Sequence, residues 1–449
     1  MVIDTGADIE SQPSDRCACG EVHRAPTKTV VIDESAIEQL VAYSKGRSWS
    51  RPFVVMDANT EEAAGSKVIG ELSQSGLYVT AFCFPERDGL LADETSVSRL
   101  HERLQGSGTD SIVAVGSGVI TDTTRYVASL MGREFVSVPT AASMDGYASN
   151  LAVMEFGGIK TSFPVAPPVA IFADPRTIAG APLDMTRAGL GDLFGKASAQ
   201  VDWLASHALY GEYFCAEVER RVTGPLVHAA THVADILEGS TEAVSGFMSG
   251  LVESGIAMAM IGNSRPASGS EHHASHFWDL LAATGRRAHT PHGLQVGYAS
   301  HFVMRLQHYA FGGDVQELST PRPVIADPFE ALSWFAGHEA EVDAVLDEKR
   351  RFLDGHSSAW PGTPLRWEAV REQLGEAMGL FPLVADALLV AGVPSQPGFL
   401  GLDVSTLKAT FRWANRIRVR YTVLDFLEGQ GRLGEAIDFA FSPEGLVAF

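Results

Sequence analysis

Short apolar runs rich in β-branched and aromatic residues alternate with helical patterns between about residues 29 and 174. Such alternation is typical of a parallel sheet wound with helices, because each crossover between parallel strands needs a long connection. The expected strands are residues 53–56, 77–82, 111–115, 135–138 and 169–172, with helices at 97–104 and 121–130. The sequence therefore predicts a doubly wound α/β domain with a mostly parallel sheet.

A two-residue turn interrupts this alternation. The runs 151–156 and 159–163 are separated only by Gly157-Gly158, which is a strong signal for a β-hairpin. We expect the hairpin to project from the sheet beside the loop that holds Asp145.

After Pro182 the sequence changes to long, periodic and largely apolar helical patterns. The expected helices are residues 185–210, 215–238, 242–261, 269–283 and 293–306, with shorter ones at 331–346 and 367–374 between proline-rich turns. The sequence thus predicts an N-terminal arm of residues 1–28, an α/β domain of residues 29–180 and an all-α domain of residues 181–449.

Composition narrows the class of partner. The chain has 449 residues and a formal net charge of −21, which argues against nucleic acid and anionic membrane surfaces as partners. No continuous apolar run reaches the length of a membrane span, and the N-terminus lacks the basic flank and apolar core of a signal peptide. Four cysteines in a chain of this length do not form a disulfide framework. We therefore expect a cytoplasmic protein.

Cys17, Cys19 and His23 form a short pattern near the N-terminus. It can be interpreted as a small metal knuckle or as part of a partly ordered arm. The arm is the favoured interpretation, because the spacing is shorter than in usual zinc-binding pairs and no second pair follows.

Three segments in the second half carry residue types that bind metals. Residues 189–196 contain Asp192, residues 270–276 contain three histidines, and His292 follows Pro291. One carboxylate and two imidazoles, without thiolate, suit Zn²⁺, Ni²⁺, Fe²⁺ or Mn²⁺ and leave coordination positions for a substrate. Two histidines four apart are more often surface or core residues, so the hypothesis depends on all three segments.

A glycine loop and an acidic residue follow two of the expected strands. Gly116-Ser117-Gly118 opens a helix, so its backbone N–H groups can hold a phosphate; a tight strand-to-helix turn is the alternative. Asp57 ends the first strand, where a carboxylate can bind an adenosine ribose or simply form the turn. The strict dinucleotide fingerprint of three glycines is absent.

Four stretches together resemble the sn-glycerol-1-phosphate dehydrogenases, in particular their bacterial AraM-type branch, within the superfamily of iron-containing alcohol dehydrogenase, glycerol dehydrogenase and dehydroquinate synthase. The stretches are residues 116–122, 139–149, 189–196 and 265–272. The resemblance implies a dehydroquinate synthase-like fold: an NAD(P)-binding α/β domain followed by an all-α metal-binding domain. It also implies reduction of dihydroxyacetone phosphate to sn-glycerol 1-phosphate with NAD or NADP and one divalent metal, Zn or Ni.

The resemblance further assigns roles to residues. It places metal on Asp192, His272 and His292, with His273 as the nearest competitor of His272, and substrate on Asp145, Asp192 and His276. His276 is also the candidate proton relay, and Lys160 and Lys196 are the candidates for the substrate phosphate, although Lys160 is equally well explained as an exposed hairpin lysine. The implied cofactor contacts, with Asp57 and the glycine loop, are Gly116, Gly118, Asp122, Thr140, Ser143 and Ser149.

Several alternatives remain open at this point. Another phosphorylated or phosphonate hydroxyketone, or glycerol itself, fits the same machinery. A dehydroquinate synthase-like cyclase is disfavoured because that pattern has Glu where Asp192 stands. The sequence leaves the choice between NAD and NADP undecided, and we expect a homodimer or a higher homo-oligomer.

Overall fold

The computed structural model describes residues 2–3, 17–157, 159–312, 334–335, 337–356, 364–446 and 448. The chain divides into two compact units. One comprises Met1–Leu193 and Glu217–Ser264, and the other Phe194–Ala216 and Arg265–Phe449. Three helices that follow the expected boundary near residue 180 therefore group with the first unit.

The first unit contains a seven-stranded sheet in the order β1-β2-β9-β6-β5-β3-β4. All neighbouring strands pair in parallel except β1 and β2. The strands are β1 Val2–Ile3, β2 Thr29–Ile32, β3 Pro52–Asp57, β4 Thr80–Phe84, β5 Ser111–Val115, β6 Phe135–Val138 and β9 Ala170–Ala173. The predicted α/β class is confirmed, and β1 and β2 are additions to the expected strands.

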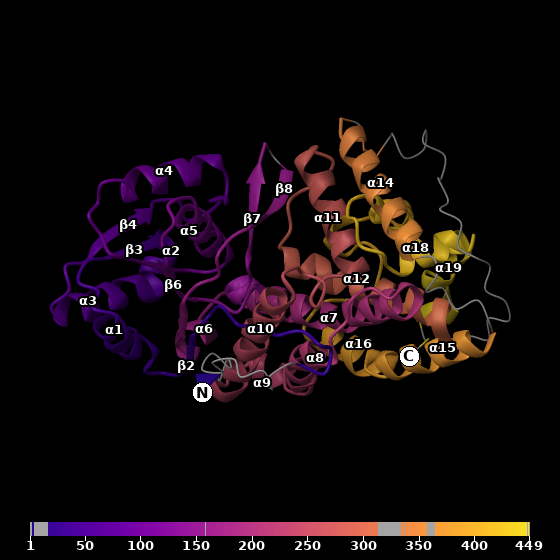
Figure 1. The fold of residues 1–449 in the computed structure, drawn as a ribbon, viewed down its shortest axis with the longest axis horizontal. Helices are drawn as coiled ribbons and strands as arrows, with labels where there is room; N and C mark the ends of the chain where they lie inside the picture. Colours follow the sequence, from indigo (N-terminus) through magenta and orange to yellow (C-terminus); the bar gives the residue numbers. More distant parts are fainter. Residues whose placement is uncertain are drawn as a thin grey trace. The chain divides into compact units, whose positions relative to one another are not determined.

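Alternate side chains of the strands pack against helices on the two faces of this sheet. Val54 and Met56 of β3 belong to the core beneath helices α1 (Ala36–Gly46) and α3 (Ser66–Gln74). Phe53 and Val55 point to the other face, under α4 (Glu94–Leu104) and α5 (Gly118–Leu130). Figure 1 shows these two pairs of helices on opposite sides of the sheet. Successive side chains of a strand alternate between faces, so a strand covered on both sides is apolar throughout.

The expected hairpin is present. β7 (Leu151–Phe156) and β8 (Ile159–Pro164) pair antiparallel, with Phe156 opposite Ile159. Gly157 has a φ of +59°, which glycine adopts without steric cost; Gly158 lies outside the described residues. The hairpin forms a sheet of its own, directly after the short 3₁₀ helix η2 (Gly146–Ala148).

The remaining elements of the first unit are helical. They are α2 Ala58–Thr60, η1 Glu61–Gly65, α6 Pro175–Ala179, the start of α7 Leu183–Tyr210, most of α8 Ala216–Thr231, α9 Val233–Leu237 and α10 Thr241–Ile261. The helix expected over 215–238 is thus two helices, α8 and α9.

The second unit is all-helical in the part that the structure describes. Its elements after α7 are α11 Ser270–Ala283, α12 His292–Gln307, η3 His308–Gly312, α14 Glu339–His356, α15 Pro364–Met378, α16 Phe381–Val390, η5 Phe399–Gly401, α17 Val404–Trp413, η6 Ala414–Arg416, α18 Val423–Gly429, α19 Leu433–Ala440 and α20 Pro443–Leu446. The expected helix at 331–346 falls partly outside the described residues.

One buried carboxylate connects several helices of the second unit. Asp202 of α7 is 0% exposed. Its Oδ2 accepts hydrogen bonds from the backbone N–H and the hydroxyl of Ser270, both at 2.7 Å. Its Oδ1 accepts from Nε2 of Gln307 at 3.0 Å and from the backbone N–H of Val423 at 2.9 Å. Asp202 therefore links α7 to the start of α11, the end of α12 and the start of α18.

Two stretches of the described residues are long and apolar enough to cross a membrane by length and composition alone, Thr241–Ile261 and Trp367–Val390. Polar residues such as Glu253 and Ser254 interrupt the first stretch, so it is not the continuous apolar run to which the expectation referred. Within the first stretch, 61% of the apolar window is buried inside the protein, as in a core helix.

We expect Asp202→Ala to lower the free energy of unfolding by about 3 kcal/mol or more, because each buried donor left without an acceptor costs about 1–3 kcal/mol. Urea unfolding followed by tryptophan fluorescence reports on this unit through the buried Trp203, Trp278 and Trp413. The matched control is Asp438→Ala, which removes a carboxylate that is 73% exposed and costs about 0–1 kcal/mol. Equal shifts for the two variants contradict the role of Asp202.

Candidate active site

The glycine loop lies at the carboxyl edge of the sheet, between β5 and α5. A Cβ on Gly116 would lie 2.6 Å from the Cβ of Ile120, so the turn requires glycine. The N-cap residue Ser117 makes no side-chain hydrogen bond to the helix, and the first-turn N–H groups of α5 are therefore available to an anion. This arrangement fits a dinucleotide pyrophosphate.

Arg125 connects α5 to the loop that follows β6. Its guanidinium is 0% exposed and donates hydrogen bonds to the carbonyls of Gly146 at 2.6 Å and Tyr147 at 2.9 Å. It also lies 3.3 Å from the carboxylate of Asp122. Burial raises the pKa of Asp122 to about 6, although the charge of Arg125 acts in the opposite direction. Asp122 thus has a structural partner in addition to its expected cofactor role.

The loop of residues 140–149 holds four of the expected site residues. Thr140 and Ser149 are buried, whereas Ser143 and Asp145 are partly exposed. The Ser149 hydroxyl accepts a hydrogen bond from the N–H of Leu151 at 3.1 Å, and the Asp145 carboxylate accepts one from Ser254 of α10 at 2.9 Å. Asp145 is therefore held in place from a second element.

Asp57 has a local structural role. Its Oδ1 accepts hydrogen bonds from the N–H groups of Asn59 at 2.9 Å and Thr60 at 2.8 Å, and so caps α2. This is the turn interpretation left open by the sequence. Oδ2 is the oxygen that would accept a hydrogen bond from a ribose hydroxyl.

Helix α7 approaches this loop closely because Gly189 has no side chain. A Cβ there would lie 1.9 Å from the backbone oxygen of Ala142. One turn further along α7, Oδ2 of Asp192 accepts a hydrogen bond from the N–H of Asp145 at 3.1 Å. The expected metal ligand and the expected substrate residue are thus in direct contact.

Three histidines gather on α11 and α12. The ring centroids of His272 and His292 are 5.2 Å apart, and those of His276 and His292 are 5.6 Å apart. Asp192, His272 and His292 each offer one ligand atom, and these atoms lie within 4.8 Å of one another. Asp192 belongs to the same continuous helix as Gly195, which packs against Val296 of α12.

Neighbouring side chains orient the two imidazoles. Nδ1 of His272 lies 2.8 Å from Oε1 of Glu271, and Nδ1 of His292 lies 2.9 Å from the hydroxyl of Ser275. Because Nδ1 of each ring is already engaged in a hydrogen bond, a metal would coordinate Nε2. A carboxylate on the second nitrogen is the usual support of a metal-binding histidine. The donor set and its supports therefore fit a divalent metal.

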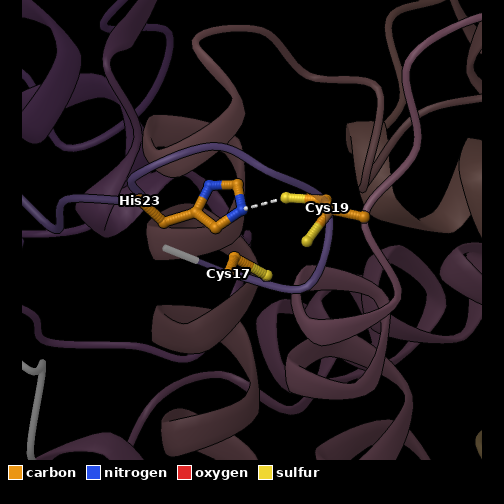
Figure 2. Close-up of side chains that lie close together, drawn as sticks. Cys17, Cys19 and His23 are labelled. Atoms are coloured by element: carbon orange, nitrogen blue, oxygen red, sulfur yellow. Dashed lines mark hydrogen bonds between the residues drawn. The ribbon is translucent and has the colours of Figure 1, made fainter. Parts of the chain in front are cut away.

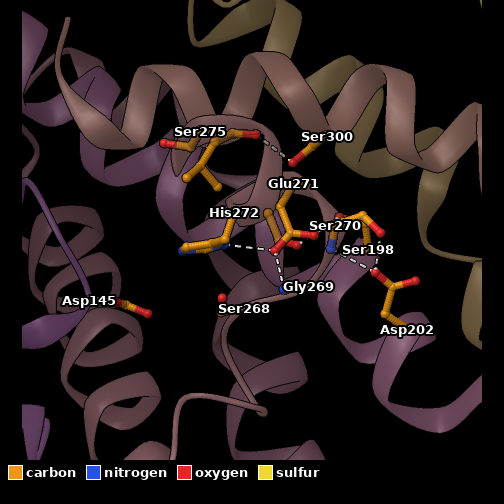
Figure 3. A network of polar contacts seen from close by, with 12 residues as sticks. Asp145, Ser198, Asp202, Ser268, Gly269, Ser270, Glu271, His272, Ser275 and Ser300 are labelled. Atoms are coloured by element: carbon orange, nitrogen blue, oxygen red, sulfur yellow. Dashed lines mark hydrogen bonds and ion pairs between the residues drawn. The ribbon is translucent and has the colours of Figure 1, made fainter. Parts of the chain in front are cut away.

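Glu271 is itself held by the start of α11. It is 0% exposed, and its oxygens accept hydrogen bonds from the N–H of Gly269 at 2.7 Å and the hydroxyl of Ser198 at 2.9 Å. Figure 3 shows this network beside the contact between Asp202 and Ser270. Burial raises the pKa of Glu271, while these hydrogen bonds and the charge of Lys196 favour the carboxylate form.

His276 is mostly buried. Its Nδ1 lies 3.8 Å from Oδ2 of Asp279. Burial lowers the pKa of His276 well below its ordinary value, and the positive charge of Arg418 lowers it further. The imidazole is therefore neutral near pH 7 and can both donate and accept a hydrogen bond.

His273, the alternative to His272, lies in a different environment. It is 0% exposed, and neither ring nitrogen has a hydrogen-bond partner in the described residues. Residues next to each other on a helix face different sides, so His273 does not belong to the group that contains His272.

The two expected phosphate lysines differ in their settings. Lys196 is 0% exposed, and its charge acts on Glu271. Lys160 lies opposite Glu155 in the hairpin. The charge of Lys196 therefore acts on a carboxylate of the protein, and Lys160 is opposite a glutamate in the backbone register of the hairpin.

Three functional candidates were not assigned from the sequence: Arg125, Glu271 and Arg418. The described residues give Arg418 no hydrogen bond or ion pair, although its charge acts on His276. From its sequence alone, the basic segment around Arg418 can equally be a solvent-exposed helix face, so the sequence does not single out Arg418. Glu271 has a sequence signal, a carboxylate directly before a metal-type histidine, whereas Arg125 has none.

Known proteins resemble this chain in sequence. Residues 31–182 match the model of the iron-containing alcohol dehydrogenase family. The glycerol-1-phosphate dehydrogenase of Bacillus subtilis (strain 168) is 34% identical over 399 residues, which cover 88% of this chain and 89% of that protein. The enzyme of the same name from Geobacillus stearothermophilus is 28% identical over 416 residues, covering 92% and 95% of the two chains.

Solved structures share the fold. A probable glycerol dehydrogenase from Sinorhizobium meliloti 1021 superposes with a TM-score of 0.59 at 16% identity, covering 91% of this chain and 97% of that one. A 1,3-propanediol oxidoreductase gives a TM-score of 0.62 at 15% identity, with coverage of 91% and 97%. Together with the similarity in sequence, this shows that the chain belongs to the glycerol-1-phosphate dehydrogenases, within the superfamily of iron-containing alcohol dehydrogenases.

Proposed function

We propose that the protein catalyses the reversible NAD(P)H-linked reduction of dihydroxyacetone phosphate to sn-glycerol 1-phosphate with one divalent metal. The observation that supports this most strongly is the group formed by Asp192, His272 and His292, whose ligand atoms lie within 4.8 Å of one another. The reaction is the one named for the relatives in Bacillus subtilis and Geobacillus stearothermophilus.

Asp192, His272 and His292 would hold the metal, with Zn²⁺ or Ni²⁺ suited to these donors. Bound there, the metal would polarise the substrate carbonyl as a Lewis acid while the nicotinamide supplies hydride. Glu271 and Ser275 keep the two imidazoles in one orientation through their Nδ1 atoms. The N–H of Asp145 does the same for the carboxylate of Asp192.

The cofactor is assigned to the first of two functional parts, residues 29–180, and the metal and most of the substrate contacts to residues 181–449, with Asp145 contributed by the first part. The start of α5 would hold the pyrophosphate, with Thr140, Ser143 and Ser149 beside it. Asp57 favours NAD, because its carboxylate repels a 2′-phosphate.

The substrate contacts proposed are Asp145, His276 and a cation for the phosphate. A neutral His276 can relay a proton to the reduced oxygen, because one ring nitrogen donates its proton while the other accepts one from solvent. Among the cations, Arg418 has the strongest support, since its charge reaches His276 and no carboxylate of the described residues forms an ion pair with it. Arg418 also favours a phosphorylated ketone over glycerol, because an uncharged triol gives no counter-charge to a half-buried guanidinium.

The setting of the enzyme belongs to the same proposal. We further propose a cytoplasmic homodimer or higher homo-oligomer without nucleic acid or membrane as partner. Of these points, the net charge of −21 supports the absence of nucleic acid and anionic membrane surfaces.

We expect the purified protein to oxidise NADH or NADPH with dihydroxyacetone phosphate, to lose this activity on chelation and to regain it with Zn²⁺ or Ni²⁺. Asp192→Asn removes the charged ligand and should lower kcat/KM about 100-fold or more. Asp184→Asn is the matched control, because that carboxylate is 75% exposed at the start of the same helix. Turnover that survives both chelation and Asp192→Asn contradicts the proposed site.

We expect Arg418→Gln to raise KM for dihydroxyacetone phosphate about 10- to 100-fold, since a hydrogen bond to a charged group contributes about 1.5–3 kcal/mol. KM for the dinucleotide should change little, and turnover of unphosphorylated dihydroxyacetone should not fall. Arg412→Gln, at an exposed position of the preceding helix, is the control. An equal loss with phosphorylated and unphosphorylated substrates rules out phosphate binding by Arg418.

A further inference from the structure

Residues 17–23 form a closed turn. The N–H of Gly20 donates a hydrogen bond to the carbonyl of Cys17 at 2.8 Å, and the N–H of Cys17 donates one to the carbonyl of Glu21 at 3.0 Å. Gly20 has a φ of +90°, in the left-handed region that favours glycine. Figure 2 shows the side chains of Cys17, Cys19 and His23 gathered by this turn, with Nε2 of His23 3.3 Å from Sγ of Cys19.

A third cysteine joins this group from far along the chain. Cys215 directly precedes α8 and is 1% exposed. Cys17, Cys19, His23 and Cys215 each offer one ligand atom, and the four atoms lie within 4.8 Å of one another. The remaining cysteine, Cys83, is elsewhere on β4, with its Sγ 3.7 Å from Oε2 of Glu61.

We propose that Cys17, Cys19, His23 and Cys215 bind one structural zinc ion. Three thiolates and one imidazole are a donor set of closed, tetrahedral zinc sites. The sulfur ligands of such an ion lie about 3.8 Å apart, because the Zn–S bond is about 2.3 Å. The four groups therefore need only a small contraction to coordinate the metal.

Neither packing nor a disulfide explains this group as well. Cys17, Cys19 and His23 are only partly buried, so they are not core side chains, and none of the four cysteines, all in the described residues, forms a disulfide. A disulfide would also explain only two of the four side chains, and not the third thiol or the imidazole. Zinc accounts for all four.

The proposed ion differs from the metal held by Asp192, His272 and His292. Four protein ligands leave no position for a substrate, and thiolates bind zinc more strongly than carboxylates do. Its role is to attach residues 17–23 to the residue that precedes α8. A short segment near a terminus needs such an attachment to stay ordered.

Cobalt substitution separates the two sites, because only the cysteine group can give thiolate-to-cobalt charge-transfer absorption in the near ultraviolet. We expect the full-length protein, loaded with Co²⁺ under reducing conditions, to show this band. After mild chelation of the open catalytic metal, the zinc form should retain about one zinc per chain by mass spectrometry. Neither readout depends on turnover or on the identity of the substrate.

Matched variants assign the band. Cys17→Ser combined with Cys19→Ser should lose both the band and the retained zinc, whereas Cys83→Ser should keep both. Because loss of the ion can unfold the segment, His23→Cys is the second test: it creates a four-cysteine set that still binds zinc and strengthens the band, while His23→Ala weakens zinc retention at least about 10-fold. Absence of the band from the wild-type protein, or its persistence in the double serine variant, overturns the proposal.

Discussion

The buried carboxylate of Asp202 is the constraint on which the all-helical unit depends. A carboxylate with 0% exposure is tolerated only when hydrogen-bond donors replace the water that it has lost. Here the donors come from Ser270, Gln307 and Val423. These residues begin α11, end α12 and begin α18, so satisfying one charge sets the positions of three helices. Ser270 is also two residues from His272, so the same contact positions the turn of α11 that carries this candidate metal ligand.

Glu271, the residue after Ser270, is a second buried carboxylate that is stabilised by hydrogen-bond donors, but it has a different effect on the structure. Asp202 fixes the backbone of α11, whereas Glu271 fixes a side chain, by accepting from Nδ1 of His272 at 2.8 Å. Gly269 and Ser198 hold Glu271 in turn. Neither carboxylate belongs to the group of candidate metal ligands, yet together they determine where Nε2 of His272 lies. An imidazole oriented in this way loses little rotational freedom when it coordinates a metal.

The fold was predictable where its signal is local. β5 and β6 occupy the expected residues, and the hairpin follows from its two-glycine turn, because strand patterns and turn chemistry depend on near neighbours. β2 is only four residues long and was not expected. The family resemblance named the candidate metal ligands Asp192, His272 and His292, and the structure brings one ligand atom of each within 4.8 Å of the others. The roles of Arg125, Arg418 and Cys215 could not be predicted from the sequence, because each depends on partners that are distant in sequence.

Arg418 and His276 show why charge placement matters to the proposed chemistry. Burial and the charge of Arg418 both lower the pKa of His276, which keeps the imidazole neutral before substrate arrives. A phosphate bound to Arg418 would neutralise that charge and remove part of the effect. The pKa of His276 would then rise towards the range in which an imidazole exchanges protons readily. On the proposed function, binding the correct anionic substrate therefore prepares the proton relay, which an uncharged diol in the same place could not do.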